Sequence, residues 1–205
     1  MNYLDLITAV LGLAYIIFEY KASIWMWVVG FVMQVLGIIL YYQKGLYADC
    51  GMEVYYLTMT VYGFWRWIGK PTATGQAGNT LTTDNGTTSD RSAAAITHMP
   101  RRVAIAWTLL ALTLWLAIYL LLVNFTDSRV PVADAFTTAL SLIGIWALAR
   151  KYLEQWFVWI AVDIVTSVLY FYKDIPFKAS LYALYVVIAI FGYHKWRRMM
   201  TAASS

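Results

Sequence analysis

The fold is decided by a stretch that occurs twice, as ADCGMEVYYLTMTVYGFWRW at residues 48–67 and as FKASLYALYVVIAIFGYHKW at residues 177–196. The identical pairs include Tyr56 with Tyr185, Gly63 with Gly192, and Trp67 with Trp196. The same offset of 129 residues continues without a gap, so that Leu4–Trp67 lies over Ala133–Trp196. Few other positions are identical, but most stay apolar in both copies. The chain therefore contains two copies of one apolar unit, and each residue of a copy has a repeat mate 129 positions away.

The composition is that of an integral membrane protein. Of the 205 residues, 61% are apolar and 13% are charged, and the mean hydropathy is +0.63. Soluble domains contain about 45–50% apolar and about 25% charged residues. The segment 103–123 contains no charged residue, and it has the length of about 20 residues that a helix needs to cross a bilayer.

We predict seven membrane-spanning helices, at residues 4–20, 23–43, 51–68, 103–124, 133–149, 155–172 and 177–195. The segment 69–100 is rich in Gly, Thr, Ser, Asn and Asp and cannot form a packed core. We therefore divide the chain into a first three-helix repeat at 1–68, a polar cytoplasmic linker at 69–102, a central linking helix with an outer loop at 103–132, and a second three-helix repeat with a basic tail at 133–205.

The positive charges predict the orientation. One side collects eleven of the fifteen basic residues, namely Lys21, Arg66, Lys70, Arg91, Arg101, Arg102, Arg150, Lys151, Lys195, Arg197 and Arg198, against Lys44, Arg129, Lys173 and Lys178 on the other. Because cytoplasmic loops are rich in Lys and Arg, we expect the N-terminus outside and the C-terminus inside. Three helices and one inserted helix make four crossings, so both repeats enter from the same side and are parallel. This 3+1+3 plan is used by transporters that bind substrate between repeats.

Two polar residues lie in the middle of predicted helices. Ionisable side chains within a span are costly and usually functional, and Asp163 is the strongest case. Its repeat mate is Gln34, so we expect the two to approach each other near the pseudo-symmetry axis. Trp159 precedes Asp163 by four residues and shares its helix face. A carboxylate beside an aromatic ring suits a flat cation, with a cation–π contact of about 0.5–2 kcal/mol. The alternative is a structural hydrogen bond from Asp163 to a neighbouring helix.

Further candidates lie near helix ends. Glu53 and Tyr56 are predicted to add polar contacts to the substrate, and Trp156 completes the predicted substrate-binding set. An acid near a helix start, such as Glu53, can instead complement the helix dipole. Glu19 is followed by Lys21 and is expected to form a surface pair with it at the inner rim.

The sequence also excludes classes of function. It contains no phosphate-binding Gly-x-x-x-x-Gly-Lys-Ser/Thr loop. The two histidines, His98 and His194, lie in the linker and at the end of the last helix, where they form neither a metal centre nor a catalytic triad. We therefore expect no enzymatic activity, no cofactor, no metal and no nucleic acid partner; the net charge of +4 mostly reports membrane topology.

Several segments resemble the PnuC family of vitamin transporters, namely Glu19-Tyr-Lys-Ala-Ser, Lys44-Gly-Leu-Tyr-Ala-Asp, Val61-Tyr-Gly-Phe-Trp-Arg-Trp, Trp159-Ile-Ala-Val-Asp and Phe191-Gly-Tyr-His-Lys-Trp-Arg. The resemblance covers nearly the whole chain except the linker. It implies a 3+1+3 fold, often a homotrimer surrounded by lipid in the bacterial inner membrane. It also implies facilitated uptake of nicotinamide riboside, thiamine or a related vitamin, drawn inward by a cytoplasmic kinase that phosphorylates it.

The substrate stays open between two vitamins. Members of the family that take nicotinamide riboside carry Trp-x-x-x-Asn in the sixth helix, whereas this chain has Trp159 followed by Asp163. A carboxylate favours an unambiguous cation, and the segment Tyr47–Tyr56 resembles the thiamine-directed members. Nicotinamide riboside is the first expectation and thiamine is the runner-up.

Three other classes of membrane protein also have several apolar helices. Sugar carriers of the SWEET type have prolines inside their helices, but Pro71, Pro100, Pro131 and Pro176 all lie in predicted loops or at helix ends. A retinal protein needs a lysine in the middle of its last helix, and the segment 181–193 has none. The third class is a membrane scaffold without transport activity, and it would be the remaining interpretation if Asp163 proved to have no role in transport.

Overall fold

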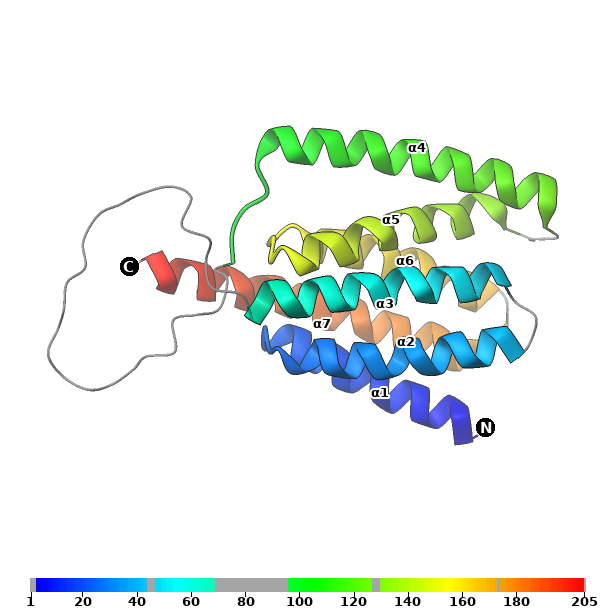
Figure 1. The fold of residues 1–205 in the computed structure, drawn as a ribbon, viewed down its shortest axis with the longest axis horizontal. Helices are drawn as coiled ribbons and strands as arrows, with labels where there is room; N and C mark the ends of the chain where they lie inside the picture. The colour runs from blue at the N-terminus through cyan, green and yellow to red at the C-terminus, as the bar shows by residue number, and fades with distance from the viewer. Residues whose placement is uncertain (1–2, 44–46, 69–95, 127–129, 173, 205) are drawn as a thin grey trace, which may run out of the picture.

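The computed structural model describes residues 3–43, 47–68, 96–126, 130–172 and 174–204. These ranges contain seven helices and no strand, as predicted (Figure 1). The helices are α1 (Tyr3–Tyr20), α2 (Trp25–Gln43), α3 (Tyr47–Ile68), α4 (Arg101–Phe125), α5 (Pro131–Ala149), α6 (Gln155–Tyr172) and α7 (Pro176–Ser204). Helix α7 continues beyond the predicted end at residue 195, because the basic segment that follows the span stays helical.

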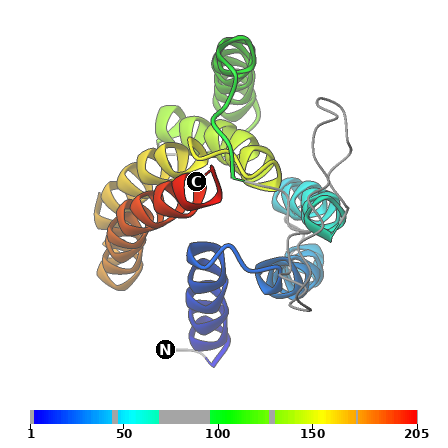
Figure 2. The same cartoon turned by 90° about the vertical axis from the view of Figure 1, so that its left-hand side faces the viewer.

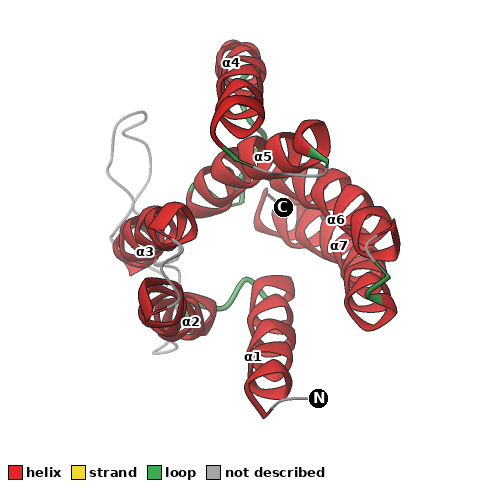
Figure 3. Ribbon diagram, turned by 90° about the vertical axis from the view of Figure 1, so that its right-hand side faces the viewer, coloured by secondary structure: helices red, strands yellow, loops and turns green. Residues whose placement is uncertain are grey.

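Six of the helices form a closed ring. Each helix packs on the next in the order α1, α2, α3, α5, α6, α7, and α7 packs back on α1. Viewed from either end, the ring is seen with α4 outside it (Figures 2 and 3). The first repeat is α1–α3 and the second is α5–α7. Helices α1 and α5 run in the same direction (Figure 1), so the two copies are parallel, and the junctions α3/α5 and α7/α1 are equivalent.

Helix α4 is attached to the second repeat. Among the described helices it packs on α5 alone, and none of its residues is buried. Its Trp107 stacks on Trp146 of α5 with ring centroids 3.9 Å apart. Residues 69–95 of the predicted linker lie outside the described residues, but its end is held in place: the Thr97 amide donates to the Lys151 carbonyl (3.2 Å), and the Leu153 amide donates to the Thr97 carbonyl (3.0 Å).

The lengths and apolar character of the helices suit a bilayer. Within the described residues, α2, α4, α5, α6 and α7 are long and apolar enough to cross a membrane, and α1 contributes the shorter apolar stretch Val10–Tyr20. Helix α3 does not reach that hydropathy because it contains Asp49, Glu53 and Arg66.

The two repeats share one packing unit at the end of the bundle where α1 and α5 finish. Its members are the tryptophan cluster, Trp27, Trp67, Trp156 and Trp196. The rings of Trp27 and Trp67 meet edge-on, with centroids 5.5 Å apart and an interplanar angle of 86°, and those of their repeat mates Trp156 and Trp196 meet with centroids 5.5 Å apart at 90°. The centroids of Trp67 and Trp196, which belong to different repeats, lie 6.3 Å apart. The duplication in the sequence is therefore preserved in three dimensions.

Glycines make this packing possible. The ring of Trp27 lies on the backbone of Gly63, and the ring of Trp156 lies on the backbone of Gly192. A Cβ atom at either glycine would overlap the ring. Both pairs are repeat mates, so α2 meets α3 in the same way as α6 meets α7.

The tryptophan cluster also closes the junctions between the repeats. The Nε1–H group of Trp67 donates to the carbonyl of Ala149 at the end of α5 (3.2 Å), and that of Trp196 donates to the carbonyl of Glu19 at the end of α1 (3.0 Å). Carbonyls in the last turn of a helix lack partners within that helix. The third helix of each repeat therefore caps the first helix of the other.

The expected surface pair of Glu19 with Lys21 is wrong. Glu19 is 4% exposed, whereas Lys21 is exposed. The Glu19 side chain instead lies within the bundle, where it interacts with Gln155 and Asp163 of α6.

We predict that Gly192→Ala destabilises the protein. Its new Cβ would lie 2.5 Å from Cη2 of Trp156, and such overpacking typically costs about 1–3 kcal/mol. The melting temperature in detergent, followed by tryptophan fluorescence, should fall. Gly51→Ala is the matched control, because nothing lies within 4 Å of its added Cβ and alanine favours the helix by up to about 1 kcal/mol. Equal melting temperatures for the two variants would contradict the packing argument.

Candidate functional site

Asp163 lies in the middle of α6 and faces the interior of the ring. It is 6% exposed, and no hydrogen bond or ion pair to it is found among the residues that the structure describes. It interacts electrostatically with Glu19 of α1 and with Tyr182 and Tyr185 of α7. Helices α6 and α1 do not pack on each other, so the interaction with Glu19 crosses the ring. A buried carboxyl group without a hydrogen-bond partner is costly, and this makes Asp163 a candidate to bind a ligand.

Trp159 lies on the same face of α6, one turn before Asp163. Its ring lies on Gly144 of α5, where an added Cβ would be 3.2 Å from Cζ2. Its indole N–H group is buried and has no hydrogen-bond partner among the described residues. The site therefore combines an aromatic surface, an unused donor and a carboxyl group on one helix.

The corresponding place in the first repeat has the reverse arrangement. There the aromatic residue is Tyr15 of α1, and its ring lies beside Gly30 of α2, 3.2 Å from an added Cβ. Gly30 is the repeat mate of Trp159, and Tyr15 is the repeat mate of Gly144. Each repeat thus has one aromatic ring at this contact, but the ring belongs to α1 in one copy and to α6 in the other.

Gln34 belongs to this first-repeat group. Its side-chain oxygen is buried, accepts no hydrogen bond from any residue that the structure describes and lies near Gly30. The hydroxyl of Thr60, a buried residue of α3, lies near the same glycine. Gln34 therefore presents an unused acceptor from the first repeat.

Glu53 and Tyr56 form a third group between α2, α3 and α5. The Glu53 carboxyl packs on Gly37 of α2, 2.8 Å from an added Cβ. The Tyr56 hydroxyl interacts with Glu53 and with the hydroxyl of Ser141 of α5. Nearby, the Tyr55 hydroxyl donates to the carbonyl of Leu142 (2.8 Å), which ties α3 to α5.

The structure thus places the predicted residues in separate groups on α2, α3 and α6. Trp159 and Asp163 lie together, Glu53 and Tyr56 lie together, and Gln34 lies beside Tyr15 and Thr60. No direct interaction between Gln34 and Asp163 is found in the described part of the chain. Trp156 is fully buried in the tryptophan cluster, and its indole N–H group has no hydrogen-bond partner.

Two polar residues of the interior were missed as site candidates. Gln155, at the start of α6, is 0% exposed, and neither polar atom of its amide makes a hydrogen bond of good geometry to a described residue. Glu19 is similarly buried, and the same is true of its Oε1 atom, although the two side chains interact with each other. Their repeat mates are the apolar residues Met26 and Leu148. A polar residue opposite an apolar mate was the signal that could have identified both.

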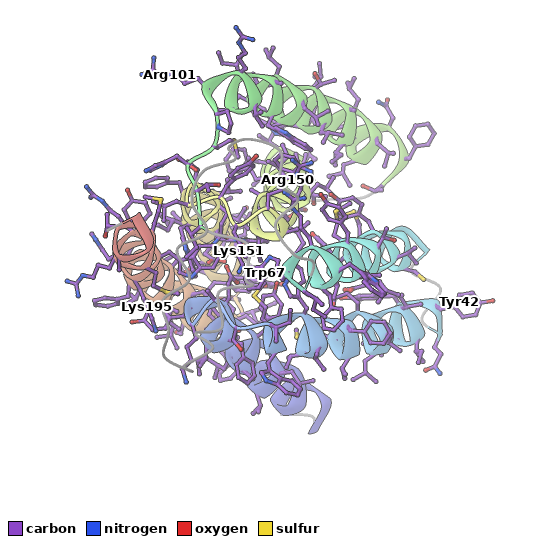
Figure 4. All side chains as sticks on the ribbon, turned by 60° about the vertical axis from the view of Figure 1, so that its left-hand side comes forward. Tyr42, Trp67, Arg101, Arg150, Lys151 and Lys195 are labelled. Carbon is purple, nitrogen blue, oxygen red and sulfur yellow. The ribbon has the colours of Figure 1, made fainter. Side chains whose placement is uncertain are left out.

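Basic side chains gather at the end of the bundle that holds the tryptophan cluster. Arg101, Arg150, Lys151 and Lys195 lie toward this end, and Tyr42 lies at the other (Figure 4). No group of three or more His, Cys, Asp or Glu residues suited to a metal occurs among the described residues.

Lys151 in the α5–α6 turn is an unusual member of this basic group. Its side chain is 3% exposed, and Nζ lies 4.1 Å from the ring centroid of Trp67. Its backbone has a left-handed φ of 54°, and its repeat mate Ala22 has a φ of 50°. Burial lowers the pKa of Lys151 from 10.5 to about 8.

Comparison with known proteins gives a consistent family assignment. Residues 2–198 match the model of the family described as nicotinamide mononucleotide transporter. The chain is 25% identical over 195 residues to the riboflavin/roseoflavin transporter RibM of Streptomyces davaonensis, covering 94% of this chain and 83% of RibM. It is 23% identical over 206 residues to the nicotinamide riboside transporter PnuC of Neisseria mucosa, covering 97% of this chain and 73% of that protein. A crystal structure of the vitamin B3 transporter PnuC has the same fold, with a TM-score of 0.66 and 20% identity over 95% of this chain and 80% of that one.

We predict a pH-dependent effect of Lys151→Met on stability. Below about pH 8 the folded protein must bury the charged lysine, whereas the unfolded chain stays protonated up to about 10.5. As the pH rises between these values, the folded protein loses the proton first, so the wild type gains stability relative to the variant. The melting temperature of the variant minus that of the wild type should therefore fall between about pH 7 and about pH 10.

Lys21→Met is the control for net charge in this experiment, because Lys21 is exposed. If the difference for Lys151→Met stays constant with pH, or follows that of Lys21→Met, the burial argument is wrong.

Proposed function

This chain belongs to the nicotinamide mononucleotide transporter family, and from that membership we propose that it takes up a small, flat, positively charged vitamin by facilitated diffusion. It is a multi-pass membrane transporter and not an enzyme, as the sequence predicted. Nicotinamide riboside is the first candidate substrate, since the relatives of that specificity match most of the chain.

The observation that carries the proposal is the Asp163 carboxyl group, which is buried on α6, has no hydrogen-bond partner among the described residues and interacts electrostatically with Glu19 of α1. The proposed substrate brings a positive charge to this group. The aromatic ring of the substrate stacks on Trp159. The contact between the Trp159 indole and Gly144 of α5 holds this aromatic surface in place. Charge attraction and stacking together favour a planar cation over a neutral solute of the same size.

The other predicted residues supply secondary contacts in this proposal. Gln34 offers an unused hydrogen-bond acceptor from the first repeat. Glu53 and Tyr56 offer polar atoms at the junction of α2, α3 and α5. Trp156 offers an indole N–H group from the tryptophan cluster.

The membrane setting completes the proposal. We place the basic end of the bundle in the cytoplasm, with the N-terminus outside, because positively charged loops stay on the inner side. The proposed location is the bacterial inner membrane, and the proposed assembly is a homotrimer. A cytoplasmic kinase that phosphorylates the vitamin would keep its inward gradient, because the charged product does not return through the site.

Thiamine is the second candidate, favoured by the carboxyl groups of Asp163 and Glu53. Riboflavin belongs in the same assay because of the likeness to RibM, although its ring is neutral. Because the chain belongs to this family, the SWEET-type carrier that the sequence left open as an alternative is no longer a candidate.

The test is uptake of nicotinamide riboside, thiamine and riboflavin into liposomes that contain the purified protein. Asp163→Asn should lower the affinity for a cationic substrate about ten- to a hundredfold, because a hydrogen bond or ion pair to a charged group contributes about 1.5–3 kcal/mol. The matched control is Asp174→Asn, which removes an exposed carboxyl group from the α6–α7 turn and should leave uptake unchanged.

Two results would count against the proposal. If the wild type takes up none of the three vitamins, the proposed function is wrong. If Asp163→Asn transports a cationic vitamin as well as the wild type does, the carboxyl group has only a structural role.

A further inference from the structure

Glu19 and Gln155, here called the inner polar pair, face each other across the interior of the ring. Glu19 is 4% exposed and Gln155 is 0% exposed. The Gln155 amide lies close enough to the Glu19 carboxyl to interact with it. Nevertheless, Glu19 Oε1 and both polar atoms of the Gln155 amide lack a hydrogen bond of good geometry within the part of the chain that the structure describes. Buried groups of this kind are normally paired, so the pair has unused capacity to bind a polar molecule.

The position of the pair relates it to the proposed substrate site. Helices α1 and α6 do not pack on each other, so the pair spans the interior. Gln155 and Asp163 lie on the same helix, about 12 Å apart along its axis at 1.5 Å per residue, and Glu19 interacts with both side chains. The pair therefore lies at the level of the tryptophan cluster, next to Trp156 in the chain, and within reach of a molecule of nucleoside length bound at Asp163.

The fold does not need polar residues at these positions. The repeat mate of Glu19 is Leu148 in the second repeat, and that of Gln155 is Met26 in the first. Both mates are fully buried in the hydrophobic core. Two apolar side chains thus fill the equivalent place without any polar atom to satisfy. The polar pair is present once, on one side of the pseudo-symmetry axis, as expected for contacts to a single asymmetric ligand.

We propose that Glu19 and Gln155 form a second subsite that binds adjacent hydroxyl groups of the substrate, while Trp159 and Asp163 hold its ring. This inference rests on the proposed function and narrows the substrate to vitamins that carry a sugar or polyol. A carboxylate accepts hydrogen bonds from two neighbouring hydroxyls, and a side-chain amide both donates and accepts. A simple cation would satisfy Glu19 but would leave the amide N–H groups of Gln155 without acceptors.

The chemistry of the pair discriminates between the candidate vitamins. Nicotinamide riboside carries a ribose with adjacent hydroxyls, and riboflavin carries a chain of hydroxyls. Thiamine has a single terminal hydroxyl. The inner polar pair therefore favours the first two, although Asp163 alone does not exclude thiamine.

The experiment measures binding of matched ligands to the purified protein. Nicotinamide riboside is compared with 1-methylnicotinamide, which is methylated on the ring nitrogen and so keeps the cationic ring but lacks the ribose. Riboflavin is compared in the same way with lumiflavin, which lacks the polyol. The variants are Gln155→Met, which copies the repeat mate, and Glu19→Gln, which keeps the size of the side chain. Melting temperatures confirm that both variants are folded.

We expect each variant to weaken binding of the hydroxylated ligand about tenfold, the effect of losing roughly one or two hydrogen bonds, and to leave its hydroxyl-free partner unchanged. Asp163→Asn should instead weaken the binding of nicotinamide riboside and of 1-methylnicotinamide alike, which separates the two subsites.

The inner subsite is overturned if the wild type binds nicotinamide riboside or riboflavin but neither variant changes that affinity. It is also overturned if both members of a ligand pair weaken equally, since the pair would then act through packing, or if the wild type binds thiamine and neither hydroxylated vitamin. Failure of the wild type to bind any of the vitamins would instead overturn the proposed function, and the subsite with it.

Discussion

The rings of Trp27 and Trp156 lie directly on the backbones of Gly63 and Gly192, and the arrangement of both repeats follows from that contact. In a bilayer, apolar side chains gain little from leaving lipid, so helices associate through close packing and interhelical hydrogen bonds. A glycine opposite an indole gives a large contact area at a short helix separation. The same rings bring Trp67 and Trp196 to the ends of α5 and α1, where their N–H groups bond to the last carbonyls. One contact thus sets both the spacing within each repeat and the junctions between repeats.

Much of this architecture could be predicted from the sequence, because the constant offset between the copies and the apolar spans both follow from residue type alone. The pairing of Trp159 with Asp163 could be predicted for the same reason, since four-residue spacing places them on one helix face. The burial of Glu19 could not, because its side-chain neighbours, Gln155 and Asp163, lie far away in the chain on α6. The contact of Glu53 with Gly37 likewise depends on how α3 lies against α2. Periodicity describes the faces of a helix but not the neighbour that meets each face.

The two repeats differ in a limited set of interior positions. In the first repeat Tyr15 packs on Gly30, and at the equivalent contact of the second repeat Trp159 packs on Gly144. The aromatic ring therefore comes from a different helix in each copy, while the combined size of the two residues is similar. Glu19 of the first repeat occupies the position of Leu148 in the second, and Gln155 of the second repeat occupies the position of Met26 in the first. Positions that pack helices together, such as the tryptophan cluster, are the same in both. A duplicated scaffold with an asymmetric interior can hold a single, asymmetric molecule on its axis, which two identical copies could not do without presenting the same groups twice.

The anchoring of residues 96–100 on the α5–α6 turn has a mechanical consequence. Thr97 exchanges backbone hydrogen bonds with that turn, and Glu154 accepts a hydrogen bond from the Met99 amide and contacts His98 at 2.8 Å. Helix α4 is therefore joined to the second repeat at its start as well as along its side, where Trp107 stacks on Trp146. Any rocking of one repeat against the other would carry four helices as one body and three as the other. The hinge surfaces would then be the α3/α5 and α7/α1 junctions, each of which is crossed by one indole hydrogen bond.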